Sequence, residues 1–312
     1  MLQTLINNLY RIPKSRWKEI IRFGGFFSYK KILKQKKKMI IASQKIPAIF
    51  SHEDGLNVYF LTGKKYLYQT LFCAHSLVKF ATKEKFKFTL IDDGSFDTEF
   101  ISQIHLQMPG VKIITQAEIE KNLSNKLPIS EYPYLHHKRN VYPHIKKLTD
   151  IHTINDNSYK LVLDSDMLFW NEPTELINWL KQPDGCIYML DCAEAYGFDR
   201  SLMKLLCGYE IPDLVNVGAF GLQSSDINWH DVEYWSKTLE EKQGPSYFLE
   251  QALSAMIIAN HTKTILNKEQ YIVNPTEQKG KNIKLHHYVD LSKKYYYENA
   301  LKNLMEFTAK SE

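Results

Sequence analysis

Short apolar runs alternate with helix-like segments through the middle of the chain. Runs rich in β-branched and aromatic residues predict strands at 56–61, 86–91, 111–114 and 159–163. Apolar residues spaced three and four positions apart predict helices at 66–80 and 97–108, and another helix that ends at 148–153. Strands that alternate with helices are typical of a mostly parallel α/β sheet with helices on both faces. In such sheets, ligands bind beyond the carboxyl ends of the strands.

The N-terminal segment differs from the rest of the chain in charge. Residues 1–40 hold eleven of the 40 Lys and Arg residues but one of the 35 Asp and Glu residues, so this segment carries +10 and the remainder −5. Apolar residues at helical spacing over 15–38, interrupted by Gly24-Gly25, predict one basic amphipathic helix or a pair of them. We therefore predict a basic helical arm over 1–50 and one larger domain over 51–312.

Three roles fit this arm. It can pack on the body with its lysines in solvent, it can lie on an anionic membrane surface through residues 1–40, or it can contact nucleic acid. The acidic body offers no second basic patch, so we expect no nucleic acid among the partners.

The cysteines and the hydropathy pattern bear on location. Four cysteines without metal-binding spacing suit a reducing compartment. No run of about 18 apolar residues occurs, and the first residues lack the pattern of a secretory signal. We expect a cytoplasmic protein, which would be peripheral on the cytoplasmic face of a membrane if the arm lies on lipid.

An acidic pair stands at the end of one predicted strand. Asp164 and Asp166 follow the apolar run 159–163 and precede another apolar run. Two carboxylates in a D-x-D pattern at a strand end can share one divalent cation; the alternative is a plain acidic turn. The chain lacks the usual motifs of P-loop NTPases, Rossmann dehydrogenases, zincins and serine hydrolases. For an α/β sheet with a carboxylate-bound metal, this leaves mostly phosphate chemistry, in which the metal stabilises a diphosphate leaving group.

Several segments, in the same order, resemble GT-A fold glycosyltransferases, which use nucleotide-sugar donors. Within that group the chain is most similar to glycosyltransferase family eight, over roughly residues 56–295. The segments are FLTGKKYLYQTLFCAHSL, FTLIDDGS, Lys147-Leu148, Asp164-Ser165-Asp166, Asp191, Asn216 to Gly221, Glu250-Gln251, and His287 to Lys293. The resemblance implies a GT-A type, Rossmann-like, mostly parallel sheet between helices, with the basic arm added at the N-terminus.

The resemblance also implies a function and a role for individual residues. The function is transfer of a sugar, with retention, from a nucleotide-sugar such as a UDP-sugar to a glycan or glycolipid acceptor. Mn²⁺ or Mg²⁺ would be held by Asp164, Asp166 and His287, and catalysis would involve Asp191, Glu250 and Gln251. The residues implied in donor binding are Thr62, Gly63, Tyr66, Asp93, Lys147, Ser165, Asn216, Gly218 and Lys293.

The chain departs from the family pattern at two places. Lys147 stands where the family has an arginine, so it keeps the charge but loses the bidentate fork. Asp290 stands where a glycine is expected in the turn before Lys293, and Lys294 and Tyr295 replace a proline and a tryptophan. An acid at position 290 would oppose a diphosphate.

Some assignments stay open from the sequence. His286 is adjacent to His287 and can replace it as the metal ligand, although the spacing to Lys293 favours His287. Gln251 can be a polar residue on a helix face. His136-His137 stands in a Pro- and Tyr-rich loop, and we interpret the pair as surface or acceptor-site residues. Tyr295 to Tyr297 is interpreted as a packed or interfacial aromatic tail, with a platform for the sugar as the alternative.

Two other functions are weighed. A sugar nucleotidyltransferase needs a glycine-rich basic loop after the first strand, and residues 61–65 hold one glycine. A binding protein that kept the fold but lost turnover would explain Asp290 and Lys147.

Overall fold

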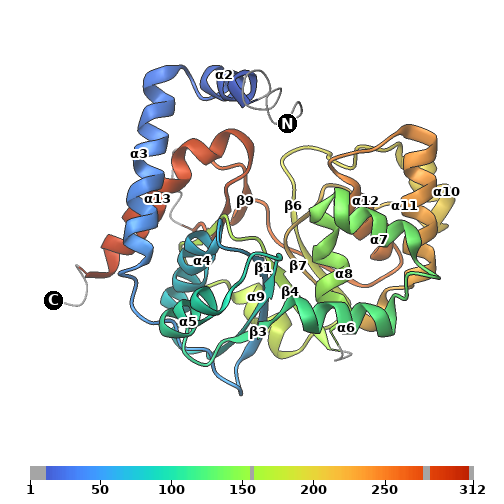
Figure 1. The fold of residues 1–312 in the computed structure, drawn as a ribbon, viewed down its shortest axis with the longest axis horizontal. Coiled ribbons are helices and arrows are strands. Elements are labelled where there is room, and N and C mark those ends of the chain that lie inside the picture. Colours follow the sequence, from blue (N-terminus) through green and yellow to red (C-terminus); the bar gives the residue numbers. More distant parts are fainter. Residues whose placement is uncertain (1–11, 155–157, 277–281, 309–312) are drawn as a thin grey trace.

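A computed structural model describes residues 12–154, 158–276 and 282–308. Its centre is a seven-stranded sheet in the order β3-β2-β1-β4-β7-β6-β8, and a three-stranded sheet in the order β5-β10-β9 lies beside it (Figure 1). The strands are β1 (Leu56–Thr62), β2 (Phe86–Asp92), β3 (Lys112–Ile114), β4 (Tyr159–Leu163), β5 (Met167–Phe169), β6 (Cys186–Leu190), β7 (Val215–Gln223), β8 (Lys263–Ile265), β9 (Tyr271–Val273) and β10 (Leu285–His287).

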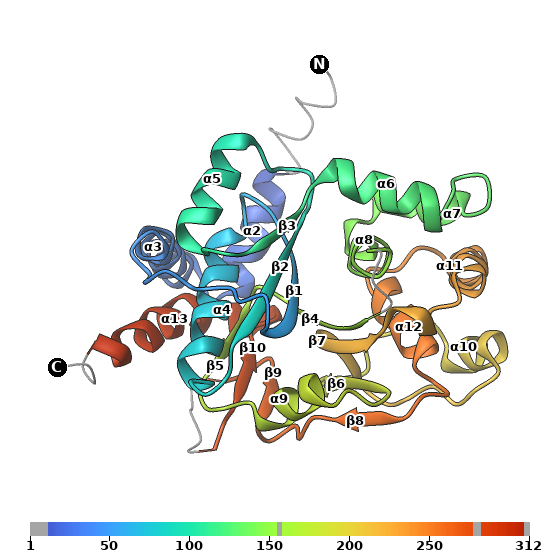
Figure 2. The same cartoon turned by 90° about the horizontal axis from the view of Figure 1, so that it is seen from below.

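Helices cover both faces of the large sheet (Figure 2). The described helices are α2 (Ile12–Arg22), α3 (Phe26–Ser43), α4 (Leu67–Phe80), α5 (Thr98–Gln107), α6 (Gln116–Lys126), α7 (Pro133–Val141), α8 (Lys146–His152), α9 (Thr174–Lys181), α10 (Arg200–Cys207), α11 (Trp229–Gln243), α12 (Leu249–Ile257) and α13 (Lys293–Thr308). Short 3₁₀ turns occur at Pro143–Ile145, Ser224–Asp226 and Asp290–Ser292. Among the described residues, we find no helix long and apolar enough to cross a bilayer.

The central strands are apolar along their whole length because both of their faces are buried. In β1, Tyr59 belongs to the core cluster that includes residues of α6 to α8 and α10 to α12, whereas Val58 and Phe60 point to the other face and belong to the cluster that includes residues of α4, α5 and α9. Successive side chains of a strand point to opposite faces, so a run without polar residues requires cover on both sides. The sheet is therefore a middle layer, and the turns at its edge are where polar chemistry can gather.

The predicted fold class is confirmed. Strands β1 to β4 lie within one or two residues of their predicted ranges, and β1 pairs in parallel with both β2 and β4. β7 is antiparallel to both β4 and β6, so the sheet is mixed toward that edge. The Pro- and Tyr-rich segment interpreted as a surface loop contains helix α7, because Pro133 stands at its first turn, where proline is tolerated.

The basic N-terminal segment forms two helices. α2 and α3 meet at Gly24-Gly25, and both glycines adopt positive φ. α3 packs along α13 and against α4, with Met39 fully buried beside Tyr68 and Tyr296. The division at residue 50 stays a prediction.

Buried ion pairs fix α7 against its neighbours. The Arg139 guanidinium donates two hydrogen bonds to the Asp150 carboxylate of α8, at 2.7 and 3.0 Å, and both side chains are buried. Thr149 Oγ1 donates to the same carboxylate at 2.7 Å. α8 also carries Lys147, so this pair holds the helix that supplies one positive charge to the candidate site.

We predict that Asp150→Ala lowers the free energy of unfolding by about 3–5 kcal/mol, because it leaves a buried guanidinium without its main partner. Glu120→Ala is the matched control, since Glu120 contacts the same guanidinium at 3.2 Å but is 56% exposed, and it should cost less than about 1 kcal/mol. Urea unfolding of both variants measures the difference. Equal losses would mean that the buried pair does not fix α8.

Candidate functional site

The D-x-D segment lies between two short strands and is fixed by backbone hydrogen bonds on both sides. The Asp164 backbone N–H donates to the Gly218 carbonyl of β7 at 2.7 Å, and the Tyr288 N–H donates to the Asp166 carbonyl at 2.9 Å. β4 ends immediately before Asp164 and β5 begins immediately after Asp166. The two carboxylates are thus held at the carboxyl end of a central strand.

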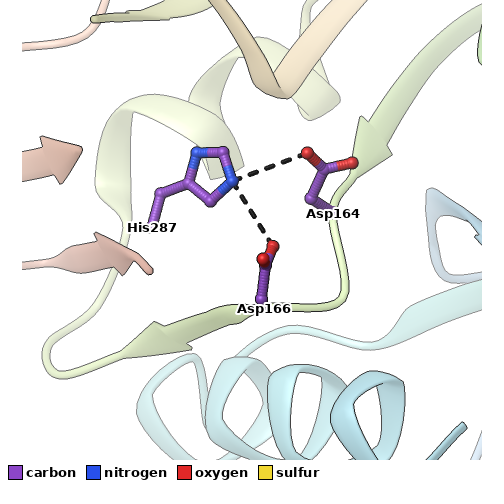
Figure 3. A group of neighbouring side chains, drawn as sticks. All are labelled: Asp164, Asp166 and His287. Atoms are coloured by element: carbon purple, nitrogen blue, oxygen red, sulfur yellow. Dashed lines mark ion pairs between the residues drawn. The ribbon is translucent and has the colours of Figure 1, made fainter. Parts of the chain in front are cut away.

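His287 faces both carboxylates (Figure 3). Its Nε2 atom lies 3.5 Å from Asp164 Oδ2 and 3.4 Å from Asp166 Oδ1. His286 points the other way, because neighbours on a strand alternate, and its Nδ1 accepts a hydrogen bond from the Trp170 indole at 3.1 Å. Of the two adjacent histidines, His287 is the one that the fold brings to the acidic pair.

The orientation of the His287 ring is set by β7. Its Nδ1 lies 3.1 Å from Asn216 Oδ1, which also accepts from the Gly218 N–H at 3.0 Å. A Cβ atom at Gly218 would overlap the imidazole ring. Glycine at this position therefore leaves the space that the ring occupies.

Two lysines add positive charge to the acidic pair. The Lys147 ammonium lies 2.9 Å from Asp164 Oδ1, and the Lys293 ammonium lies 3.4 Å from Asp166 Oδ2. Burial alone would raise the carboxyl pKa values, but Lys147 and His287 outweigh it at Asp164, and His287 and Lys293 at Asp166, so both pKa values are lowered. Burial likewise opposes the charged form of His287, yet its two carboxylate partners raise the imidazole pKa to about 9.

A second network joins the residues predicted to act on the sugar. Asp191 Oδ2 accepts hydrogen bonds from the side-chain amides of Asn216, at 2.9 Å, and Gln251, at 3.2 Å. The Cys192 N–H donates to the other oxygen of Asp191 at 2.7 Å. Because Asn216 also contacts His287, the network is continuous with the acidic pair.

Glu250 lies on the Lys147 side of the site instead. Its carboxylate is 3.7 Å from the Lys147 ammonium and is buried. Burial raises the pKa of Glu250 to about 7, with Lys147 opposing the shift. One ammonium cannot neutralise both carboxylates, so the charge pair forms with the nearer Asp164, and the more deeply buried Glu250 is the group that becomes protonated.

The remaining predicted donor residues lie at the ends of β1 and β2. Gly63 follows β1, and a Cβ atom there would overlap the Asp93 carboxylate. Tyr66 is the residue before α4, and its side chain is 44% exposed. The Thr62 hydroxyl at the end of β1 contacts the Thr70 hydroxyl, which in turn contacts Ser165 of the D-x-D segment.

Two residues of the site were not found from the sequence. Thr70 Oγ1 lies 2.7 Å from Thr62 Oγ1 and 2.8 Å from Ser165 Oγ, which makes a hydroxyl chain between β1 and the D-x-D segment. The Tyr296 hydroxyl donates to the Ser165 carbonyl at 3.2 Å. Thr70 lies in the first turn of α4, and the signal for its role in the sequence was weak because this helix also carries the polar residues Gln69, His75 and Ser76.

The structure accounts for the aspartate at position 290. Asp290 adopts φ +47°, the left-handed region that favours glycine and tolerates aspartate better than most residues. Its carboxylate forms an ion pair with Arg22 of α2. The backbone path that a glycine would allow is thus kept, and the added charge has a partner.

Asp164, Asp166 and His287 fit a divalent cation. One ligand atom from each lies within 4.8 Å of the others. Two carboxylates and an imidazole are ligands that suit Mn²⁺. Because a cation binds the neutral imidazole, binding would displace the His287 proton.

The sequence matches no family model and no curated protein. Solved structures do match. The galactosyltransferase LgtC, in complex with donor and acceptor sugar analogues, has a TM-score of 0.54 at 12% identity over 80% of this chain and 95% of that chain. The fold is that of GT-A glycosyltransferases.

Two further structures agree with this assignment of the fold. The bifunctional glycosyltransferase WbbM has a TM-score of 0.52 at 12% identity, over 81% of this chain and 50% of that chain. Mouse xyloside xylosyltransferase 1 has a TM-score of 0.50 at 11% identity, over 77% of this chain and 97% of that chain.

We predict that Gly218→Ala weakens Mn²⁺ binding at least about tenfold, a loss of about 1.4 kcal/mol, because the new methyl group displaces the His287 ring. Gly221→Ala is the control on the same strand, where the methyl group would meet Trp179 and Ile187 instead. It should lower stability and leave the affinity unchanged. Calorimetric titration with MnCl₂ compares them, and equal affinities would argue against His287 as a ligand.

We predict that Glu250→Gln gains stability relative to wild type as the pH rises from about 4.5 to about 7. The folded wild type holds a proton there that the unfolded chain has released, since burial raises the pKa of Glu250 to about 7 from 4.5. The wild type therefore loses unfolding free energy over this window and the glutamine variant does not, a difference of about 1–3 kcal/mol. Melting curves at several pH values check it, with exposed Glu99→Gln as control; parallel curves for all three proteins would contradict it.

Proposed function

We propose that this chain is a metal-dependent glycosyltransferase that moves a sugar from a nucleotide-sugar, a UDP-sugar, to a glycan or glycolipid acceptor. The observation that carries the proposal is the meeting of Asp164, Asp166, His287 and Lys293 at the end of β4. The GT-A fold supports it, because the solved structures that share the fold are glycosyltransferases.

The donor diphosphate would bind where the positive charges gather. Asp164, Asp166 and His287 would hold a divalent cation that would supply charge neutralisation for the diphosphate, and the imidazole favours Mn²⁺ over Mg²⁺. The Lys293 ammonium, 3.4 Å from Asp166, adds stabilisation of the leaving group. The nucleoside would lie at the ends of β1 and β2, along Thr62, Gly63 and Asp93, with its base on the exposed ring of Tyr66.

The sugar would lie against the Asp191 network, and we infer transfer with retention. Inversion needs a general base opposite the leaving group. Gln251 is an amide and not a base, and both oxygens of Asp191 already accept hydrogen bonds. The Glu250 carboxylate lies on the Lys147 side of the site, away from the Asp191 network. This favours stabilisation of positive charge at the anomeric carbon by Gln251 over base catalysis. A glutamine-to-glutamate change in LgtC is described as an active-site mutation, which agrees with a glutamine at such a place.

Aromatic side chains beside Glu250 suit a saccharide acceptor. The Glu250 N–H donates to the Tyr142 hydroxyl at 3.3 Å, and that hydroxyl donates to the Tyr247 carbonyl at 2.6 Å. The Tyr247 side chain is 68% exposed, and its ring stands 4.9 Å from His144. Aromatic rings combine an apolar face with a polar edge, as a sugar does.

The four cysteines are free thiols, two of them buried. Free thiols suit the reducing cytoplasm, which is the location we propose.

We predict that UDP together with MnCl₂ stabilises the wild type against heat and does not stabilise Asp166→Asn. At a hundredfold excess over Kd the gain is about 2.7 kcal/mol. Asp184→Asn, at an exposed position away from the site, is the control and should keep the full shift. No shift in the wild type, or an equal shift in all three proteins, would contradict the proposed donor site.

Slow hydrolysis of UDP-sugars tests turnover directly. A panel of UDP-sugars with MnCl₂ should yield UDP and free sugar from one donor, and Gln251→Ala should lower that rate. Release of pyrophosphate from UTP and a sugar 1-phosphate would assign a nucleotidyltransferase instead. Nucleotide binding without any hydrolysis over hours would indicate a non-catalytic protein of the same fold.

A further inference from the structure

The N-terminal arm, defined as α2 and α3, is fastened to the body on one side. The Tyr29 hydroxyl of α3 donates to Glu19 of α2 at 2.8 Å. Arg22 pairs with Asp290, and the Lys31 ammonium lies 3.1 Å from Glu298 of α13. Figure 1 places α3 at the edge of the molecule with α13 beside it. The arm therefore holds a fixed orientation relative to the candidate site.

Large apolar side chains project from the other side of the arm. Trp17 and Ile21 are 64% and 63% exposed and lie one turn apart on α2. Each is two residues from Glu19, about 200° around the helix, so they point away from its contact with Tyr29. At the start of α3, Phe26 is 52% and Phe27 is 86% exposed.

Exposed lysines follow these apolar side chains along α3. At spacings of three and four residues, they lie on the side of the helix away from the buried Ile32 and Met39. The Lys30 ammonium stands 4.6 Å above the Phe26 ring. These exposed side chains of the two helices, which we together call the outer face of the arm, are Trp17, Ile21, Phe26, Phe27, Lys30, Lys34, Lys37, Lys38 and Ile41.

We propose that the outer face of the arm binds the surface of an anionic lipid bilayer. Its lysines complement acidic headgroups, and its tryptophan, phenylalanine and isoleucine side chains enter the boundary between headgroups and acyl chains. Glu19 is the one acid within residues 12–45, and it contacts Tyr29, so no carboxylate of the arm opposes an anionic surface.

Two other occupants fit this face less well. A second copy of the chain would bring two strongly basic faces together, which repel each other. Nucleic acid would match the lysines but leave Trp17, Ile21 and Phe27 without hydrocarbon to enter. The combination of positive charge and exposed apolar side chains favours the bilayer.

Binding through this face would hold the candidate site close to the membrane. Arg22 of the arm pairs with Asp290, which is three residues after His287. Three residues span at most about 11 Å. The turn that carries the metal ligand is therefore attached directly to the helix that would lie on the lipid.

The test uses the full chain and three sets of four substitutions. In the lysine variant, Lys30, Lys34, Lys37 and Lys38 become Gln. In the apolar variant, Trp17, Ile21, Phe26 and Phe27 become Ser. In the control variant, Lys112, Lys121, Lys237 and Lys242, which are exposed elsewhere on the surface, become Gln. All lie on the surface, and melting temperatures check that each variant folds.

Co-sedimentation uses vesicles of phosphatidylcholine with increasing fractions of phosphatidylserine. We expect the wild type and the control variant to pellet more strongly as the anionic fraction rises, and less strongly as salt rises. The lysine and apolar variants should each lose more than about tenfold in partition coefficient. The proposal would be overturned if the lysine and apolar variants bound the vesicles as well as the control variant does, or if the wild type did not bind them at all.

Trp17 provides a second readout. Brominated lipid should quench tryptophan fluorescence of the wild type, and Trp17→Phe should bind the vesicles equally while losing most of that quenching. If the wild type bound duplex DNA more tightly than vesicles, and the apolar variant bound DNA as tightly as the wild type, the surface would be assigned to nucleic acid instead.

Discussion

The site depends on keeping two carboxylates together at the end of one strand. Asp164 and Asp166 repel each other, and partial burial strengthens that repulsion, so the pair requires positive charge from elsewhere in the fold. Lys147 of α8, His287 of β10 and Lys293 of α13 supply it from three separate elements. The antiparallel pairing of β10 with β5, in which His287 stands opposite Met167, is therefore as necessary to the site as the acids themselves.

The frame that holds these charges extends to the N-terminal arm. α13 begins with Lys293 and packs against α3, and the turn before it is tied to α2 by the ion pair between Arg22 and Asp290. The arm thus supports the cationic side of the site while its outer face remains exposed. Support of the body and contact with a membrane are compatible roles for the same two helices, because they use opposite sides.

The central strands and the acidic pair could be predicted because their signals are local. Apolar runs bounded by turn residues predicted β1 to β4. The D-x-D pattern at the end of one such run predicted the site. The choice between His286 and His287 required the register of β10, whose partner β5 is distant in sequence and whose two partner strands are only three residues long. Thr70 was missed because its role depends on a tertiary contact with Ser165, and α7 was missed because Pro133 was interpreted as a loop residue and not as a helix start.

Anomalous diffraction from crystals grown with MnCl₂ and UDP tests the central claim most directly. The account predicts one manganese peak in contact with Asp164, Asp166 and His287, with the UDP diphosphate bound to the same ion on the side of Lys293. A peak elsewhere, or a diphosphate bound without any metal at the acidic pair, would contradict it.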